Sequence, residues 1–144
     1  MNTPEQRRLE DALDREIEAA RRLATVLRDE RAALTGDKPE TVHQLAADKI
    51  RLFTEIEAME VERRSLWGSP EGGADRAATV AGRWRTLMEL MAGCRTANEV
   101  NGHIIHIRQN QIRQLLDVVR GGAPVTYGRQ GKTYATALRA LARA

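Results

Sequence analysis

A long apolar stripe between Trp84 and Val119 is the feature of this sequence that most constrains its fold. Its positions advance by steps of three and four residues, which is the spacing of one face of an α-helix. The apolar members are Trp84, Leu87, Met91, Cys94, Ile105, Ile112, Leu115 and Val119. This spacing predicts one long helix, over about residues 76–119, with a hydrophobic face along its length.

Polar residues interrupt the middle of this stripe, in the string NEVNG. Asn98, Asn101 and Gly102 have low helix propensity, and a buried amide side chain requires a hydrogen-bond partner. We therefore expect Asn98 or Asn101 to bond across to another helix or chain. At Gly102 we expect the missing side chain to let a neighbouring backbone approach closely.

Two further helices are predicted in the first half of the chain. The first, over about residues 4–35, begins after Thr3, with Pro4 at its first position. Its heptad repeat consists of Leu13, Ala20, Leu27 and Leu34, with Ile17 and Ala24 between them. The second, over about residues 38–66, is expected to start from Asp37. Its stripe consists of Val42, Leu45, Leu52, Ile56, Met59 and Leu66, with Lys49 and Arg63 as polar members of the same register.

These patterns predict an all-α fold, an antiparallel three-helix coiled-coil bundle over residues 1–122. Only 3% of the residues are aromatic, which is typical of helical bundles rather than of sheet proteins. The third helix is longer than the other two, so one of its ends should project or bend. Residues 123–144 are predicted to form a flexible loop and a short amphipathic tail helix, because about eleven residues make only a marginal helix in isolation.

Charge is divided unevenly between the two halves of the chain. Residues 1–75 hold 12 Lys and Arg against 17 Asp and Glu, a net charge of −5, whereas residues 76–144 hold 11 against 3, a net charge of +8. A basic second half suggests nucleic acid or an acidic protein surface as a partner, or packing of the two halves on one another through faces of complementary charge. Nucleic acid is disfavoured, because the chain has no recognised binding motif and few aromatic residues that could stack on bases.

The sequence also bears on the compartment. No apolar run approaches the ~20 residues needed to cross a bilayer, and the N-terminal string MNTPEQRRLE lacks the apolar core of a signal peptide. A single Cys excludes an internal disulfide. We expect a soluble cytoplasmic protein that does not insert stably into a membrane.

Enzymatic and metal-binding residues are scarce. His103 and His106 are three residues apart on the predicted helix, but both point away from its apolar face, and a third metal ligand beside them is available only from Glu99. Cys94 lies in the apolar stripe, where a thiol acts as a small hydrophobic group. We therefore expect no metal, no cofactor and no catalytic activity.

The order of the sequence features resembles the FlgN family of flagellar export chaperones. The resembling segments are LRDERAAL, LAADKIRLFTEIEAMEVERR, WRTLMELMAGCRTANEVNGHII and LLDVVRGGAPVTYGRQGKT. The most specific element is Asn98-x-x-Asn101-Gly102, followed some 25 residues later by Tyr127-Gly128 and Gly131. The resemblance covers about residues 9–133, and the Arg-rich third helix and Ala-rich tail depart from the family's pattern.

The resemblance implies a chaperone that binds the unfolded terminal segments of the two hook–filament junction proteins, FlgK and FlgL. It further implies delivery of these segments to the export gate protein FlhA. The family's C-terminal region is associated with substrate binding, and a Tyr that corresponds to Tyr127 is associated with docking at the gate.

The apolar residues expected to bind substrate come from the end of the third helix and from the tail. They are Ile112, Leu115, Leu116 and Val119 on the helix and Leu138 and Leu141 on the tail. The tail residues would cover the same surface when no substrate is bound. The alternative function is a structural coiled-coil or adaptor protein that oligomerises through its helices, and the same stripe would then be a homodimer interface.

Overall fold

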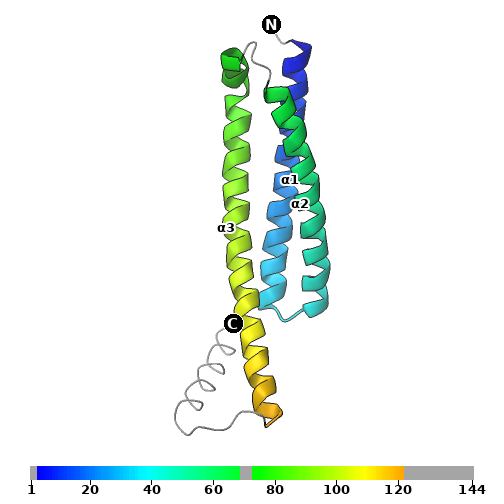
Figure 1. Cartoon of the computed structure of the whole chain (residues 1–144), viewed down its shortest axis with the longest axis vertical. Coiled ribbons are helices and arrows are strands. Elements are labelled where there is room, and N and C mark those ends of the chain that lie inside the picture. Colours follow the sequence, from blue (N-terminus) through cyan, green and yellow to red (C-terminus); the bar gives the residue numbers. More distant parts are fainter. Residues whose placement is uncertain (1–2, 69–72, 122–144) are drawn as a thin grey trace. The chain divides into compact units, whose positions relative to one another are not determined.

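Three α-helices make up the described part of the chain (Figure 1). The computed structural model describes residues 3–68 and 73–121. Helix α1 spans Pro4–Thr35, α2 spans Pro39–Trp67 and α3 spans Gly73–Val119, which at 47 residues is the longest. The predicted all-α fold with a long third helix is therefore confirmed, whereas the predicted tail lies outside the described residues.

The first and second helices begin differently. At α1, the Thr3 side chain accepts a hydrogen bond of 3.2 Å from the backbone N–H of Gln6, as expected of a residue that caps a helix. The prediction that α2 starts from Asp37 is wrong, because Lys38 precedes its first residue, Pro39. Asp37 has a φ of 56°, in the left-handed region, and therefore forms the turn rather than the extended cap.

Contacts divide the chain into two units, Met1–Glu99 and Val100–Ala144, and each is described separately. In the first unit, α1 and α2 run antiparallel as a hairpin, and the first part of α3 packs on them (Figure 1). The backbones of α1 and α2 approach each other closely, whereas the backbone of α3 lies farther away and α3 contacts them through side chains. This arrangement confirms the predicted packing of three helices.

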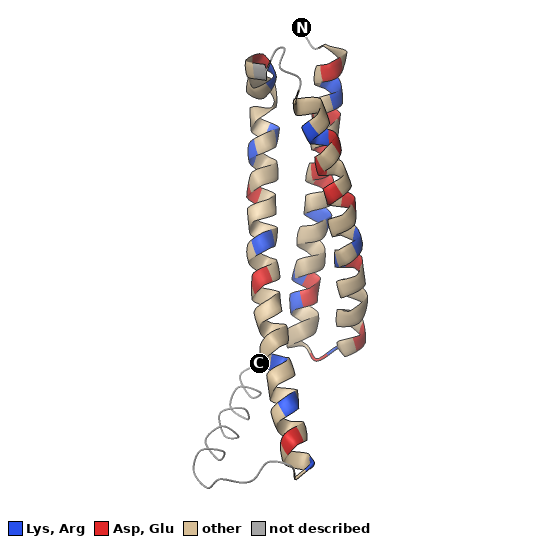
Figure 2. Ribbon diagram, in the orientation of Figure 1, with Lys and Arg blue, Asp and Glu red and all other residues tan. Residues whose placement is uncertain are grey.

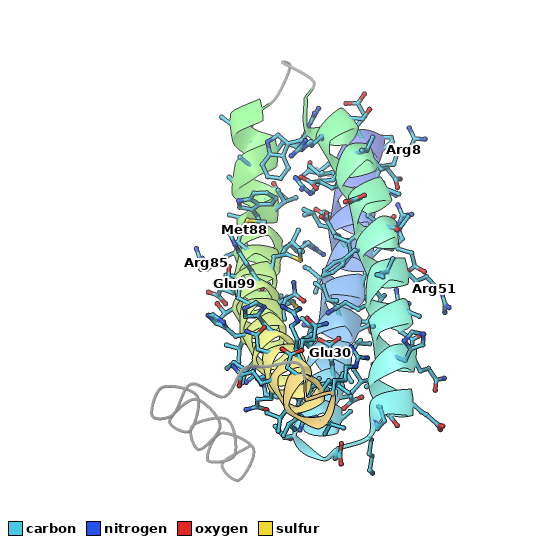
Figure 3. All side chains as sticks on the ribbon, turned by 60° about the horizontal axis from the view of Figure 1, so that its bottom comes forward. Arg8, Glu30, Arg51, Arg85, Met88 and Glu99 are labelled. Carbon is cyan, nitrogen blue, oxygen red and sulfur yellow. The ribbon has the colours of Figure 1, made fainter. Side chains whose placement is uncertain are left out.

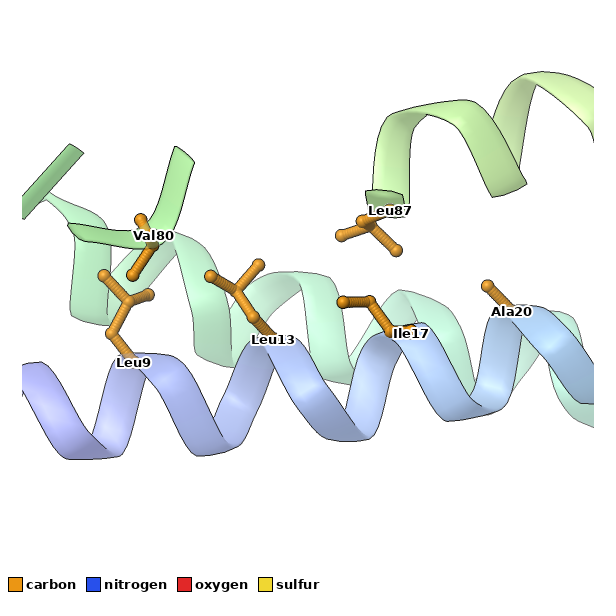
Figure 4. Packing of buried hydrophobic residues seen from close by; sticks show 6 residues of the cluster. All are labelled: Leu9, Leu13, Ile17, Ala20, Val80 and Leu87. Carbon is orange, nitrogen blue, oxygen red and sulfur yellow. The ribbon is translucent and has the colours of Figure 1, made fainter. Parts of the chain in front are cut away.

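The core of the first unit consists of two apolar clusters built largely on α1. The first cluster contains Leu9, Leu13, Ile17 and Ala20 of α1 with Val80 and Leu87 of α3 (Figure 4). The second contains Ala19, Leu23, Leu27, Leu52, Ile56 and Cys94. Of the heptad residues predicted for α1, all are buried except Ala24, which is half-buried, so the repeat correctly identified the inner face of the helix.

Two buried ion pairs join α1 to α2. Arg63 Nε donates to Glu16 Oε2 at 2.7 Å, and Lys49 Nζ lies 2.9 Å from Glu30 Oε2. Glu16 and Glu30 are 3% and 0% exposed. The two acids are 14 residues apart on α1 and the two bases are 14 residues apart on α2, which is two heptads in each case. A shift of α2 along α1 by one helical turn would break both ion pairs, so these pairs fix the register between the two helices.

Candidate partner-binding site on α3

The apolar stripe of α3 differs in exposure between its two halves. In the first unit, Leu87 is fully buried and Cys94 is 4% exposed. In the second unit, Ile112 is 56% exposed and Val119 is 82% exposed, although both continue the same spacing. A run of large exposed apolar side chains on one helix is typical of a partner-binding surface.

We define the α3 stripe as Ile105, Ile112, Leu115, Leu116 and Val119. Steps of three, four and seven residues place these side chains on one face of the helix. Ile112, Leu116 and Val119 are exposed, and Ile105 and Leu115 are half-buried. Four of the residues predicted to bind substrate thus share one accessible surface. The other predicted site residues, Leu138, Leu141 and Tyr127, lie outside the described residues.

Arginine residues accompany the α3 stripe. Arg108 occupies a stripe position, four residues before Ile112, while Arg113 and Arg120 lie three residues before and four residues after Leu116. Figure 2 shows basic residues recurring along this part of α3. Within residues 3–68 and 73–121, none of these three side chains forms an ion pair.

Two arginines of α3 in the first unit, Arg76 and Arg83, do form ion pairs. Arg83 Nε donates to Asp14 Oδ1 at 2.9 Å, and Arg76 Nη2 lies 3.0 Å from Glu5 Oε2. The hydrogen bond to Asp14 raises the pKa of Arg83. Acidic residues of α1 therefore neutralise these two arginines of α3, whereas Arg108, Arg113 and Arg120 form no ion pair among the described residues. From the sequence, only the net positive charge of the second half was linked to a partner, and not these individual arginines.

Gln111 adds an unusual polar group next to these residues. Its side chain is 4% exposed, yet among the described residues neither its amide nitrogen nor its amide oxygen has a hydrogen-bond partner. Gln111 lies three residues after Arg108 and four before Leu115. Because an unsatisfied buried amide is costly, this side chain is suited to bond with a group supplied by a partner.

At the polar interruption of the stripe, a bond from Asn98 or Asn101 to another helix stays a prediction, whereas the prediction for Gly102 is tested. Asn101 is fully buried and Asn98 is half-buried. The prediction for Gly102 is wrong: this residue is exposed, and a Cβ built on it would meet no atom within 4 Å. Successive helical residues are about 100° apart, so a residue next to a buried Asn can face open space.

This open position leads to a prediction about stability. Gly102→Ala should raise the free energy of unfolding by about 0.5–1 kcal/mol, because Ala has the higher helix propensity and nothing obstructs its methyl group. Urea denaturation followed by circular dichroism measures the change. Gly82→Ala, at another unobstructed helical glycine of α3, is a matched control and should behave alike. Destabilisation at Gly102 alone would show a close contact there.

Catalytic and metal-binding groups do not assemble in the described part of the chain. His103 and His106 are exposed, as the helical register predicted. In residues 3–68 and 73–121, no group of three or more His, Cys, Asp and Glu is placed to hold a metal ion. Cys94 is buried, and burial raises the pKa of its thiol, which disfavours the reactive thiolate. Across the same ranges, no helix has the length and apolar character to span a membrane.

The two tryptophans form an aromatic contact at the other end of α3. The rings of Trp67 and Trp84 have centroids 5.3 Å apart, and the guanidinium carbon of Arg63 lies 4.7 Å from the Trp84 centroid. Together with Arg64 and Gly68 they line a shallow depression of about 320 Å³. Because Arg63 also bonds Glu16, this cluster ties together all three helices of the first unit.

The fold defines an all-α protein whose third helix exposes apolar side chains on one face. More particularly, the chain belongs to the FlgN family, because the family model described as FlgN protein matches residues 1–135. Membership implies a flagellar export chaperone for hook-associated proteins, and hence a protein that is not an enzyme, as the sequence predicted. Neither the curated proteins nor the solved structures give a match to the chain.

Proposed function

We propose that this protein is a cytoplasmic chaperone of flagellar export that binds the terminal helices of hook-associated proteins on the α3 stripe. The observation that carries the proposal is the exposure of Ile112, Leu116 and Val119 on one face of α3. A helix can place its own apolar face on such a stripe, as amphipathic helices do in hydrophobic grooves. Membership of the FlgN family supports the choice of hook-associated proteins as the source of that helix.

The physical logic of a chaperone suits the terminal segments of axial proteins. A segment that carries an apolar face for later assembly is prone to aggregate while that face is uncovered. Covering it with the α3 stripe protects it during storage. Because the interaction uses one exposed helix face rather than a closed cavity, the segment can be released without unfolding the α1–α2 hairpin. Leu138 and Leu141 belong to this proposal as additional apolar contacts contributed by the tail.

Delivery to the export gate is the second part of the proposal. Tyr127 stands between Thr126 and Gly128 in the string VTYGRQG, and its ring offers an apolar face together with a hydroxyl group. Tyrosine is enriched among residues that dominate interface energetics. We assign Tyr127 to the contact with a gate protein of the FlhA type, which leaves the α3 stripe free to hold the substrate.

Pull-down experiments against each partner test this division of roles. Wild-type protein should retain both a hook-associated protein and the cytoplasmic part of the gate protein. Tyr127→Ala should lower gate binding by about tenfold or more, the loss expected for an interface hot spot, and leave substrate binding unchanged. Tyr134→Ala, the other Tyr of the chain, serves as the control.

Two outcomes would contradict the proposal. If the wild-type protein retains no hook-associated protein, the chaperone function itself is wrong. If Tyr127→Ala weakens both interactions and also lowers the melting temperature, Tyr127 is a structural residue and the docking assignment is wrong.

A further inference from the structure

The positive charge beside the α3 stripe bears on which kind of partner helix can bind there. We propose that the stripe selects an acidic amphipathic helix, one whose carboxylates pair with Arg108, Arg113 and Arg120 while its apolar face covers Ile112 and Leu116. This proposal rests on the proposed function and narrows its substrate class. The residues that carry it are three arginines without ion pairs in the described part of the chain and a buried amide without a hydrogen bond.

Arg108 gives the strongest requirement for a carboxylate. It lies within the stripe, three residues after Ile105 and four before Ile112, and it is already half-buried. A helix that packs on the stripe removes more water from this guanidinium. A buried cation without a counter-charge is costly, so a helix that presents a carboxylate here is favoured over one that presents an apolar or basic residue.

Arg113 and Arg120 give a second requirement at the edge of the stripe. They lie in line with Leu116 on the helix surface, at steps of three and four residues, and both are exposed. Charged residues in this flanking position select partners in helix–helix pairing by attraction or repulsion. The only acidic residue between positions 100 and 121 is Asp117, so this face carries a net positive charge.

The same charges disfavour two other occupants. Residues 122–144 contain four Lys and Arg and no Asp or Glu, so the chain's own tail has no side-chain carboxylate to offer to Arg108. A second copy of the protein would bring its own Arg108, Arg113 and Arg120 towards the same arginines. Like charges facing each other across an interface oppose association. An acidic partner helix is therefore favoured over both the tail and a homodimer.

Gln111 supplies a contact of a different kind. Among the described residues, neither the donor nor the acceptor of its amide is paired, so this side chain, once turned outward from its buried position, can bond a carboxylate or the backbone of an approaching helix. Its position, three residues after Arg108, places both side chains within reach of the same turn of a bound helix. Binding would then satisfy a polar group that is unsatisfied among the described residues.

Two designed peptides test the charge requirement on the full-length protein. Both are 21-residue amphipathic helices with Leu at the apolar positions; one has Glu at the flanking positions and the other has Gln. Calorimetry at low salt should give about tenfold tighter binding of the Glu peptide, and this preference should shrink as ionic strength rises. Equal affinity for the two peptides, or a preference that salt does not change, would overturn the proposal.

Protein variants locate the preference on α3. Combined Arg108→Gln, Arg113→Gln and Arg120→Gln should abolish the preference for the Glu peptide. Arg85→Gln is the matched control, because Arg85 is an exposed arginine of the same helix that points outward in the first unit (Figure 3). A preference that survives in the triple variant, or that disappears in Arg85→Gln, would overturn the assignment.

Further probes separate this proposal from other functions of a basic helix and from the proposed function itself. If the triple variant loses binding to phosphatidylglycerol vesicles or to duplex RNA but keeps its preference for the Glu peptide, the arginines serve a membrane or nucleic acid and the proposal is overturned. The proposed function fails separately, if the terminal segment of a hook-associated protein does not bind wild-type protein although the Glu peptide does.

Discussion

Arg63→Leu should lower the free energy of unfolding by about 3–5 kcal/mol, because it breaks a buried ion pair. Arg63 is 7% exposed, donates to Glu16 at 2.7 Å and lies over the ring of Trp84. Its removal leaves the Glu16 carboxylate buried without its counter-charge, and it also removes the cation–π contact with α3. Urea denaturation at neutral pH, followed by circular dichroism, measures the loss.

Two control proteins identify the cause of that loss. Arg64→Leu changes the next residue, whose side chain is 72% exposed, and should alter stability by no more than about 0.5 kcal/mol. The double variant Glu16→Leu with Arg63→Leu should recover most of the lost stability, because no unpaired charge remains in the core. Comparable effects of Arg63→Leu and Arg64→Leu would contradict the structural role given to the Glu16–Arg63 pair.

The helices of this protein could be predicted because the spacing of their apolar residues directly reflects which side chains are buried. Leu13, Leu27 and Leu34 recur at heptad intervals, and each is buried on α1. The start of α2 was placed one residue early because the identity of a capping residue does not reveal its backbone angles. Asp37 is a favourable cap by type, but its positive φ assigns it to the turn.

The buried ion pairs could be predicted only in part. Lys49 and Arg63 were recognised as polar members of the α2 stripe. Their partners depend on the register between α1 and α2, and the sequence of one helix alone does not specify that register. Glu16 and Glu30 are separated by the same two heptads on α1. The separation between the two acids on α1 equals the separation between the two bases on α2, and this equality is the sequence signal that would have identified both pairs.

The candidate site shows a different limit of sequence reasoning. The apolar residues of α3 keep the same spacing from Leu87 to Val119, so this pattern does not reveal where burial ends and exposure begins. Gly102 was assigned a close contact because it adjoins Asn101, yet only Asn101 is buried. The unpaired state of Arg108 likewise depends on which carboxylates lie nearby in space, and this information comes from the structure.

Loss of the α3 stripe should produce the largest change in binding. Ile112→Ser combined with Leu116→Ser should weaken the complex with the terminal segment of a hook-associated protein by about 100-fold, because two apolar side chains no longer cover the bound helix. The two residues are 56% and 43% exposed, so their replacement should leave the free energy of unfolding within about 1 kcal/mol of wild type.

The matched control removes two exposed apolar side chains from α2 instead. Ile50 and Val61 are 64% and 69% exposed, so Ile50→Ser combined with Val61→Ser removes a similar amount of exposed apolar surface. This protein should bind the terminal segment as tightly as wild type. Circular dichroism of both double variants verifies that their helicity is retained.

The most direct test of the central claim is therefore one calorimetric titration series, in which the terminal segment is added to wild-type protein and to each double variant. The claim that the α3 stripe holds the substrate predicts an affinity about 100-fold weaker for the Ile112/Leu116 variant and unchanged for the Ile50/Val61 variant. Equal affinity of the Ile112/Leu116 variant and wild type, or a loss confined to the Ile50/Val61 variant, would contradict it.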